Sequence, residues 1–229
     1  MGSGVQPLAL KIFRGLSPSY DRVLTVSTFM QDAYWKTWLL RHAGIRDTKT
    51  ILDLGCGTGI LEERLPGSAQ VVGVDITEEM VRRAQSKAIP SLKMLTLGDG
   101  EHMPFRDGSF DTVVSCYVVK YCSPARLAKE MARVLRKGGT LVLYDFTRPR
   151  GALAPILAGY TYGILKIVGL ATRLFDPATA LTYLVLPDVI RSSVWDDNFE
   201  EVLRAAGFSP VGSRRLTGGV VTGFWASKQ

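Results

Sequence analysis

The pattern of apolar and polar positions divides the chain into short buried runs that alternate with amphipathic stretches. The apolar runs predict strands at 50–54, 70–75, 91–97, 110–119 and 140–145. Helical patterns lie at 61–66, from 77 onward, and at 124–138, 181–190 and 195–207. The closing stretch, 208–228, predicts an antiparallel pair of strands. At 229 residues the chain fits one α/β domain with an elaborated cap.

Several helix boundaries are predicted by residues with known preferences for helix ends. Thr77 is expected to cap the helix that follows it, and Asp196 or Asp197 to cap the helix at 195–207. Gly138 and Gly207 are expected to end their helices.

An aromatic-rich helical pattern precedes the first strand, from Leu8 to His42. It is interrupted at Ser17-Pro18, where proline ends one helix and can begin the next. Such a segment either packs on the core or contributes to a binding site.

The most distinctive stretch is residues 50–60, TILDLGCGTGI, in which an apolar run ends in an acid and then breaks into three alternating glycines. Gly55, Gly57 and Gly59 allow positive φ angles and a close approach of the backbone to a ligand. The helical pattern ILEERL that follows presents free N–H groups to the same loop. The sequence therefore predicts a small polar ligand at the end of the first strand.

The spacing of the glycines distinguishes between two kinds of ligand. A dinucleotide fingerprint is G-x-G-x-x-G, whereas the third glycine of this chain comes one residue earlier, so pyrophosphate is not the expected ligand. Asp75 ends the second buried run, twenty residues after Gly55, at a position that suits the hydroxyls of a ribose. A third acid, Asp99, follows the third run.

Together these features resemble the class I S-adenosylmethionine-dependent methyltransferases. The resemblance rests on Asp53 with the glycine loop, on Asp75 and Asp99, and on the motif PFRDGSFD at 104–111. It implies a Rossmann-like α/β fold, with a seven-stranded, mostly parallel sheet, helices on both faces and a helical cap. It also implies S-adenosyl-L-methionine as the cofactor. The alternative is a Rossmann-like domain that binds another ligand or none.

The resemblance also implies roles for individual residues. The loop from Asp53 to Gly59 would hold the methionine part of the cofactor and Asp75 the ribose hydroxyls, while Asp99 and Gly100 would hold the adenine amine. Tyr20 would close over the cofactor. The expected cofactor-binding residues are Tyr20, Asp53, Gly55, Cys56, Gly57, Gly59, Asp75, Ile76, Asp99, Gly100 and Ser115. Asp53 has an alternative role in orienting the loop, and Asp75 an alternative role as a helix cap.

Three further stretches resemble the ubiquinone/menaquinone biosynthesis C-methyltransferases. Residues 20–35, YDRVLTVSTFMQDAYW, match that family's N-terminal signature at Tyr20, Asp21 and Trp35. RVLRKGGTLVLYDFTRP resembles its second signature and LTGGVVTGFWASK its end, so the likeness runs from Tyr20 to Lys228. It implies C-methylation of a prenylated quinol precursor such as demethylmenaquinol.

The chain departs from that family's signatures at Leu24, Thr28, Asp32, Asp145 and Thr147. The family usually has Asn, Ser, His, Glu and Ser at these places. At 115–122 the sequence SCYVVKYC stands where the family usually has a Gly-Leu-Arg-Asn element beside the reacting centre. The difference at 115–122 concerns the contacts to the quinone ring.

Methyl transfer from a sulfonium mainly requires that the nucleophile be held in line with the S–CH₃ bond, and such orientation contributes on the order of 7–11 kcal/mol. No metal is required, and three cysteines with two histidines make no convincing zinc site. A hydroquinone carbon becomes nucleophilic when a phenolic O–H is weakened, so a general base or hydrogen-bond acceptor helps. The catalytic candidates are Asp32, Tyr117, Lys120 and Asp145.

Each catalytic candidate also has an ordinary structural explanation. Asp32 suits a solvated helix position and Lys120 a surface charge. Tyr117 suits a pocket wall, and Asp145 a contact at the end of a strand. The sequence does not choose among the four.

Residues 152–170 form the most apolar stretch of the chain. A membrane-spanning helix needs about 20 mostly apolar residues. Because this stretch contains Pro155, three glycines and Lys166, it predicts a cap of short helices and no membrane span. The apolar face of the cap either lines a pocket for a lipophilic substrate, lies on a bilayer surface, or only buries itself.

The net charge of +7 and the isoelectric point near 9.4 fit either a solvated basic face or an anionic partner. Lys and Arg are scattered without a basic-aromatic RNA-binding pattern, so nucleic acid is not expected, and a membrane surface ranks second to the solvated face. The odd number of cysteines favours a reducing cytoplasm. The expected location is the cytoplasm, and peripheral attachment to the inner face of the membrane stays open.

The sequence thus predicts a single methyltransferase domain, 1–229, in four parts. These are an N-terminal helical cap segment at 1–45, a cofactor-binding core at 46–150, a helical substrate cap at 151–195, and a last helix with an antiparallel strand pair at 196–229. Two alternatives to quinol C-methylation stay open. One is N- or O-methylation of a phospholipid or another lipophilic small molecule, and the other is a cofactor-binding partner protein without turnover.

Overall fold

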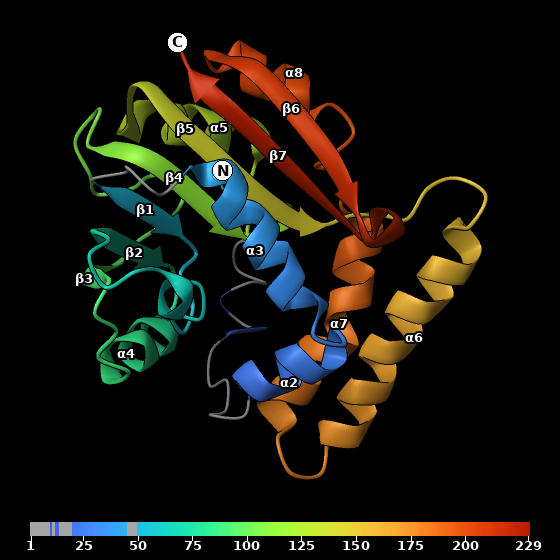
Figure 1. The fold of residues 1–229 in the computed structure, drawn as a ribbon. Helices are drawn as coiled ribbons and strands as arrows, with labels where there is room; N and C mark the ends of the chain where they lie inside the picture. Colours follow the sequence, from blue (N-terminus) through green and yellow to red (C-terminus); the bar gives the residue numbers. More distant parts are fainter. Residues whose placement is uncertain (1–9, 11, 14–19, 45–49) are drawn as a thin grey trace.

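A computed structural model describes residues 10, 12–13, 20–44 and 50–229. Its strands form one seven-stranded sheet in the order β3-β2-β1-β4-β5-β7-β6 (Figure 1). Strands β1 to β5 pair in parallel, and β7 runs antiparallel to both β5 and β6. The strands are β1 Ile51–Leu54, β2 Val71–Asp75, β3 Leu92–Leu97, β4 Phe110–Cys116, β5 Leu135–Phe146, β6 Phe208–Leu216 and β7 Val221–Lys228. The predicted fold class is confirmed.

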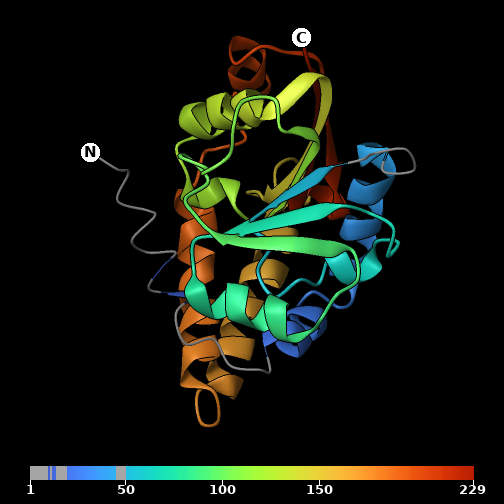
Figure 2. The same cartoon turned by 90° about the vertical axis from the view of Figure 1, so that its left-hand side faces the viewer.

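Helices cover both faces of the sheet (Figures 1 and 2). On one face Trp35 and Trp38 of α3 pack together with side chains of α6 and α7, and on the other face Leu127 of α5 packs with Phe199 of α8. The helices are α2 Tyr20–Ser27, α3 Gln31–Ala43, α4 Glu78–Ser86, α5 Pro124–Val134, α6 Ala154–Thr172, α7 Pro177–Ser192 and α8 Phe199–Ala205. Short 3₁₀ turns are η2 Glu62–Arg64, η3 Val119–Tyr121 and η4 Thr217–Gly219.

The central strands are apolar along their length because both of their faces are covered. Ile51 and Leu52 of β1, Val113 and Val114 of β4, and Leu141 of β5 are completely buried. Parallel strands under helices have this continuous apolar pattern, and burial of each such side chain contributes about 1.5–3 kcal/mol. The apolar runs that predicted the strands are therefore the core of the sheet.

The order of the strands creates a crevice between β1 and β4. From β1 the chain proceeds outward to β2 and β3, and it then returns to form β4 on the other side of β1. Since the connections leave β1 and β4 in opposite directions, a crevice opens at the carboxyl ends of these two strands. The glycine loop follows β1 directly at this place.

Two predicted helices, at 61–66 and 124–138, are longer than the helices that the structure contains. The stretch 61–66 forms only the 3₁₀ turn η2, because so few residues before Pro66 and Gly67 cannot sustain an α-helix. The helix from Pro124 ends at Val134 and β5 begins at once. Gly138, with a φ of 75°, lies inside β5, where the pairing with β4 shifts register.

The final helix is shorter than predicted, and its capping differs. It comprises only α8, and Gly207, with a φ of 93°, follows its end as predicted. Asp196 and Asp197 do not cap it, because they form ion pairs with Arg150 and Arg148. The antiparallel strand pair that follows, β6 and β7, is confirmed.

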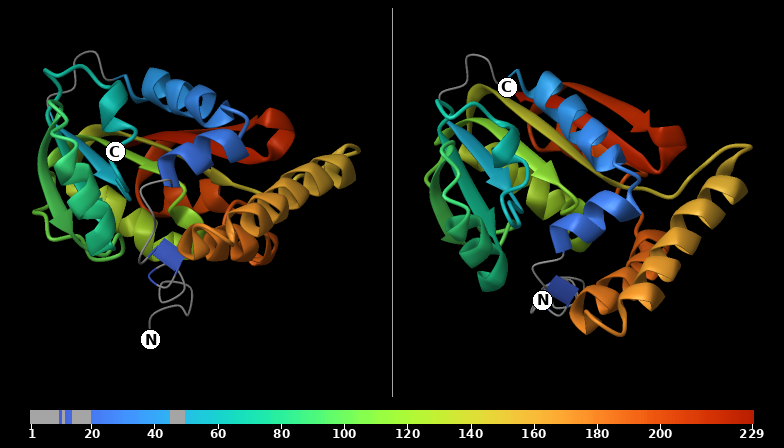
Figure 3. Two further views of the ribbon diagram at one scale, coloured as in Figure 1. Left: turned by 90° about the horizontal axis from the view of Figure 1, so that it is seen from below. Right: turned by 60° about the horizontal axis from the view of Figure 1, so that its bottom comes forward.

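The apolar stretch that predicted short helices is instead one continuous helix, α6. Pro155 lies in its first turn, where the missing N–H costs nothing. Gly169 lets α7 come close, because a Cβ there would lie 2.7 Å from Leu184 Cγ. Among the described residues, α6 is the one helix that is long and apolar enough to cross a membrane, judged by length and composition alone. In its most apolar segment, 22 % is buried inside the protein. Figure 3 shows α6 and α7 side by side, extending past the end of the sheet.

Candidate active site

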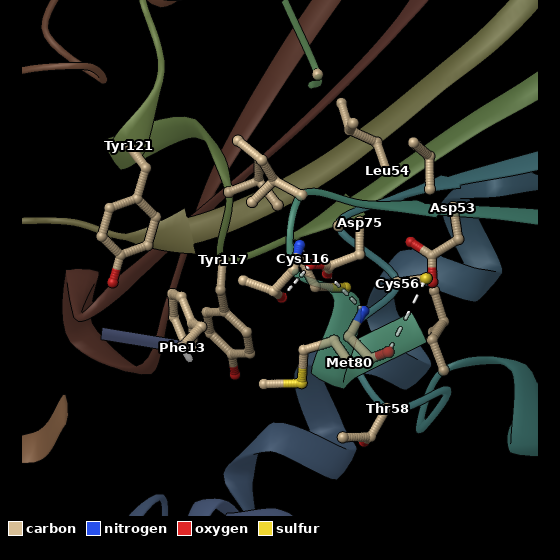
Figure 4. A pocket seen from close by; sticks show the side chains of 18 of the residues that line it. Phe13, Asp53, Leu54, Cys56, Thr58, Asp75, Met80, Cys116, Tyr117 and Tyr121 are labelled. Carbon is tan, nitrogen blue, oxygen red and sulfur yellow. Dashed lines mark hydrogen bonds between the residues drawn. The ribbon is translucent and has the colours of Figure 1, made fainter. Parts of the chain in front are cut away.

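A cavity of about 1000 Å³, including its open mouth, lies at the crevice between β1 and β4. The loops after β1, β2, β3 and β4 line it, together with residues of the N-terminal segment. Figure 4 shows Asp53, Cys56 and Thr58 on one side of it and the rings of Phe13 and Tyr117 on the other. The glycine loop and the residues that follow β4 thus line one cavity.

The glycine loop has the backbone that its sequence predicts. Gly55, Gly57 and Gly59 have φ angles of 75°, 55° and 84°, which only glycine adopts without strain. A Cβ added at Gly55 would lie 2.1 Å from Val118 Cγ2, whereas no atom of the described residues lies within 4 Å of one added at Gly57. The loop is thus pressed against the β4 side at Gly55 and leaves space beside its backbone at Gly57.

Asp75 joins the glycine loop to the start of α4. Its Oδ2 accepts a hydrogen bond from the Gly57 N–H at 2.9 Å, and its Oδ1 accepts from the Thr77 N–H at 2.9 Å and from Thr77 Oγ1 at 2.6 Å. Burial raises the pKa of Asp75, and these hydrogen bonds act in the opposite direction. Thr77 occupies the N-cap position, but its hydroxyl bonds Asp75 and makes no capping bond. Asp75 also lines the cavity, as expected for a ribose contact.

Two buried carboxyls lie against each other behind the glycine loop. Asp53 is 2 % exposed and Glu62 is wholly buried. Asp53 Oδ1 and both carboxyl oxygens of Glu62 find no N–H or O–H donor among the described residues. Burial, then the charge of Glu62, raises the pKa of Asp53 well above its usual range, and burial raises the pKa of Glu62 to about 7. These two carboxyls therefore keep their protons to a higher pH than exposed acids do.

Most of the other expected cofactor-binding residues also line the cavity, namely Tyr20, Cys56, Ile76, Asp99 and Gly100. Ser115 does not. It is 1 % exposed, and its hydroxyl donates to the carbonyl of Leu54 at 2.8 Å, which ties β4 to β1 behind the cavity wall. Ser115 lies near the end of β4, as predicted, but its side chain faces β1 and not the cavity.

The N-terminal segment is bonded to the glycine loop through Asp21. Its Oδ1 accepts from Thr58 Oγ1 at 2.6 Å, and its Oδ2 accepts from Lys87 Nζ at 2.8 Å. These bonds hold α2, and with it Tyr20, over the cavity. The predicted interruption of this segment at Ser17-Pro18 lies outside the described residues.

Two of the four catalytic candidates meet in one hydrogen-bonded cluster. Tyr117 Oη donates to Asp32 Oδ1 at 2.8 Å, and the same oxygen accepts from Lys36 Nζ and, at 3.4 Å, from Tyr144 Oη. Asp32 and Lys36 are buried, and Lys36 and Tyr117 line the cavity. Burial, then the negative charge of Asp32, raises the pKa of Tyr117 well above its usual range, so the phenol stays protonated.

The other two candidates, Lys120 and Asp145, form a buried ion pair behind Tyr117. Lys120 Nζ lies 2.8 Å from Asp145 Oδ1 and donates to the Tyr117 carbonyl at 2.5 Å, while its backbone N–H donates to Asp145 Oδ2 at 3.0 Å. Tyr117 has a φ of 66°, an uncommon angle for an aromatic residue. The pair therefore fixes a strained backbone, and these contacts favour a positioning role over contact with substrate.

Three residues of the site were missed by the sequence analysis: Lys36, Thr58 and Glu62. Asp32 and Lys36 are four residues apart and so lie on one face of α3, a spacing from which their ion pair could have been predicted. Thr58 lies within the glycine loop itself. Glu62 gave no signal, because an acid in the pattern ILEERL is typical of a solvated helix. Among the described residues no group of three or more His, Cys, Asp or Glu side chains is placed to hold a metal.

The paired carboxyls predict a pH dependence of stability. Between the usual pKa of Glu62, 4.5, and its raised value of about 7, the native state holds a proton that the unfolded state has lost, so the free energy of unfolding falls as pH rises through this window. Glu62→Gln should match the wild type near pH 5 and exceed its stability at pH 8 by up to about 3 kcal/mol, measured by urea unfolding.

The neighbouring variant Glu63→Gln is the matched control, because the Glu63 side chain is 47 % exposed and pairs with Lys87. It should keep the wild-type dependence on pH. If Glu62→Gln keeps that dependence as well, Glu62 is not the buried carboxyl that holds the proton.

Comparisons with known proteins agree with this geometry. The profile of the ubiE/COQ5 methyltransferase family matches residues 5–228. A demethylmenaquinone methyltransferase of Mycolicibacterium vanbaalenii is 32 % identical over 95 % of this chain and 93 % of its own length. The ubiquinone/menaquinone biosynthesis C-methyltransferase UbiE of Geotalea uraniireducens is 28 % identical over 95 % of each chain.

Solved structures show the same fold at lower identity. A SAM-dependent methyltransferase from Aquifex aeolicus superposes with a TM-score of 0.59 at 18 % identity, over 96 % of this chain and 97 % of the other. Phosphoethanolamine N-methyltransferase 2 of Haemonchus contortus, in complex with S-adenosyl-L-methionine, gives 0.59 at 16 % identity, over 85 % of this chain and 52 % of the other. The chain belongs to the ubiE/COQ5 methyltransferase family and is an S-adenosylmethionine-dependent methyltransferase.

Proposed function

We propose that this protein transfers the methyl group of S-adenosyl-L-methionine to a ring carbon of a prenylated quinol precursor such as demethylmenaquinol. The observation that carries the proposal is that Tyr117 and Lys36, both hydrogen-bonded to the buried Asp32, line the same cavity as the glycine loop. The names of the relatives, which are quinone-pathway methyltransferases, support the same acceptor.

The residues around the glycine loop fit S-adenosyl-L-methionine. The space beside Gly57 admits a ligand against the backbone, and Asp53 carries an unpartnered carboxyl oxygen beside the loop. Asp75 and Asp99 line the same wall. Carboxylates near a ligand that carries an ammonium and a sulfonium gain favourable charge interactions. When bound, this cofactor supplies an electrophilic methyl group.

The cluster at Tyr117 suits a phenolic acceptor. A quinol hydroxyl placed against Tyr117 Oη can donate its proton to that oxygen while Tyr117 passes its own proton to Asp32 Oδ1, along the existing 2.8 Å hydrogen bond. The Lys36 ammonium beside Asp32 compensates the buried negative charge before this transfer. The net change is a proton moved from the quinol to Asp32, which leaves an electron-rich ring.

The electron-rich ring carbon then forms a bond to the methyl carbon, and the S–CH₃ bond breaks with its electron pair left on sulfur. The ring then loses the proton at that carbon to solvent water, and the phenolic oxygen regains its proton from Asp32 through Tyr117, which restores the aromatic quinol and leaves Asp32 ionised again. Asp32 and Tyr117 act on the phenolic proton, whereas Lys120 and Asp145 hold the Tyr117 backbone in place. The protein thus contributes alignment and one proton acceptor, which is what methyl transfer to carbon requires.

The proposed location is the cytoplasm, at the inner face of the membrane. All three cysteines are free, which fits a reducing compartment. Helix α6 and the turn after it expose apolar side chains, among them Ile156 and Ile167 on the helix and Leu174 in the turn, which are 70 %, 66 % and 95 % exposed. Lys166 on α6 and Arg173 just after it are also exposed and suit anionic lipid headgroups. A helix of this kind binds in the plane of the bilayer surface.

Membrane association predicts flotation with vesicles that contain anionic phospholipid, and weaker flotation with purely zwitterionic ones. The double variant Ile167→Asp/Leu174→Asp should stay at the bottom of the gradient. Leu97→Asp, on the distant edge strand β3 and 55 % exposed in the wild type, should float as the wild type does. If all three proteins float equally, α6 does not bind the membrane.

The direct test of the acceptor is transfer of labelled methyl from S-adenosyl-L-methionine into chemically reduced demethylmenaquinone in detergent. A total polar-lipid extract is incubated in parallel as the competing acceptor. We expect label in the quinone fraction and none in the polar lipids. Label only in the polar lipids would favour N- or O-methylation of a phospholipid, and cofactor binding without label in either would favour a partner protein without turnover.

The ribose role of Asp75 is tested separately, by calorimetry with S-adenosylhomocysteine. Asp75→Ala should weaken binding about tenfold or more, since hydrogen bonds to a charged group contribute ~1.5–3 kcal/mol. The same variant should no longer distinguish S-adenosylhomocysteine from its 2′,3′-dideoxyribose analogue. Asp107→Ala, which removes a carboxylate that is 82 % exposed, serves as the control. A variant that binds both ligands weakly but in the wild-type ratio would show that Asp75 acts only on the loop.

A further inference from the structure

A second, smaller cavity lies on the other side of the N-terminal helices. It measures about 360 Å³ with its open mouth and lies between the turn that joins α2 to α3, the helix α6, and the 3₁₀ turn η4. Trp35, Phe146, Tyr160, Ile164, Leu165 and Val220 supply its apolar lining. We call it the α6 groove.

The α6 groove lies beside the reaction cavity, with two stacked rings between them. Tyr117 lines the reaction cavity and Phe146 lines the groove. Their ring centroids are 5.0 Å apart and their planes differ by 22°. Trp35 meets Phe146 edge to face at 5.9 Å, on the groove side. The stacked rings of Tyr117 and Phe146 thus form a wall between the two cavities.

The other end of the α6 groove opens on the exposed apolar surface. The rings of Phe29, in the α2–α3 turn, and Tyr160, on α6, lie 5.6 Å apart and are 58 % and 41 % exposed. Met30 beside them is 70 % exposed. The groove thus runs from Phe146, on the far side of the ring stack from the reaction cavity, to the surface that we propose lies against the bilayer.

The polar atoms along the α6 groove are mostly satisfied within the protein. Ser27 Oγ bonds Tyr183 Oη at 3.0 Å, Thr28 Oγ1 bonds the Leu24 carbonyl at 2.9 Å, and Trp35 Nε1 bonds Thr217 Oγ1 at 2.9 Å. Thr161 Oγ1 has no partner among the described residues. Gln31 also lines the groove. Because most of the other polar side chains are already bonded and the rest of the lining is apolar, the groove suits a hydrocarbon chain better than a headgroup or a sugar.

We propose that the α6 groove binds the polyprenyl chain of the acceptor whose ring lies in the reaction cavity. The inference rests on the proposed function, and it names the part of the acceptor that selects lipid-linked quinols over free ones. The ring lies beside Tyr117, the first isoprene units pass the Tyr117–Phe146 stack, and the chain continues between α6 and the α2–α3 turn toward the bilayer.

The test fills the groove and compares acceptors that differ only in the chain. Ile164→Phe and Ile164→Trp, on the groove side of α6, should lower kcat/KM for a long-chain demethylmenaquinol progressively, about tenfold or more for Trp and mainly through KM. The same variants should leave kcat/KM for a naphthoquinol without a chain within about twofold of the wild type. Met94→Trp, on the edge strand β3 and 45 % exposed in the wild type, is the control for the added indole and should change neither value.

The affinity of each variant for S-adenosylhomocysteine reports whether the cofactor half is intact. If the Ile164 variants lose activity on both acceptors equally, or keep full activity on the long-chain acceptor, the groove does not hold the chain. If the wild type labels neither quinol, the proposed function fails and this inference fails with it. If the wild type methylates both quinols but the Ile164 variants do not differ from it in their preference for the long-chain acceptor, only the inference about the groove is overturned.

Discussion

The hydrogen bonds accepted by Asp75 are the restraint on which the active site depends. The glycine loop takes a left-handed backbone at three positions, and such a loop is held in one shape only if its N–H groups find partners. Asp75 provides that partner at Gly57 and, through Thr77, fixes the loop against the start of α4. The strand order then places this loop across a crevice from the residues that follow β4.

The two sides of the cavity differ in charge, and the difference matches two different reactants. The cofactor side carries Asp53, Asp75 and Asp99, and burial raises the pKa of the first two because it disfavours their charged forms, so a cationic ligand beside them would favour their ionisation. The acceptor side carries a neutral phenol, Tyr117, hydrogen-bonded to a carboxylate that is already paired with Lys36. Such a side binds a polar aromatic ring and can take one proton from it.

The cofactor side could be predicted from the sequence because it depends on backbone rules. Alternating glycines after a buried run predict the loop, and acids at the ends of neighbouring parallel strands converge, as Asp75 and Asp99 do. Ser115 shows the limit of this reasoning. Whether a side chain at a strand end faces the cavity or the neighbouring strand depends on the local register, and the hydroxyl of Ser115 faces Leu54.

The acceptor side was harder to predict because it depends on packing between distant segments. Asp32 and Tyr117 were identified one by one, but their contact joins residues 85 positions apart in the sequence. The proline and the glycines of residues 152–170 predicted several short helices. However, Pro155 lies in the first turn, where a helix tolerates proline, and Gly169 leaves space for Leu184 of α7. The continuous helix that results forms one wall of the α6 groove.

The central claim is that the methyl group goes to a ring carbon of a quinol held beside Tyr117. The most direct measurement is NMR of the product made from demethylmenaquinol and S-adenosyl-L-methionine with a ¹³C-labelled methyl group. The account predicts a labelled methyl bonded to an aromatic carbon, with the ring proton at that position lost and both hydroxyls free. A labelled methoxy group, with the ring proton retained, would contradict it and would assign oxygen as the acceptor atom.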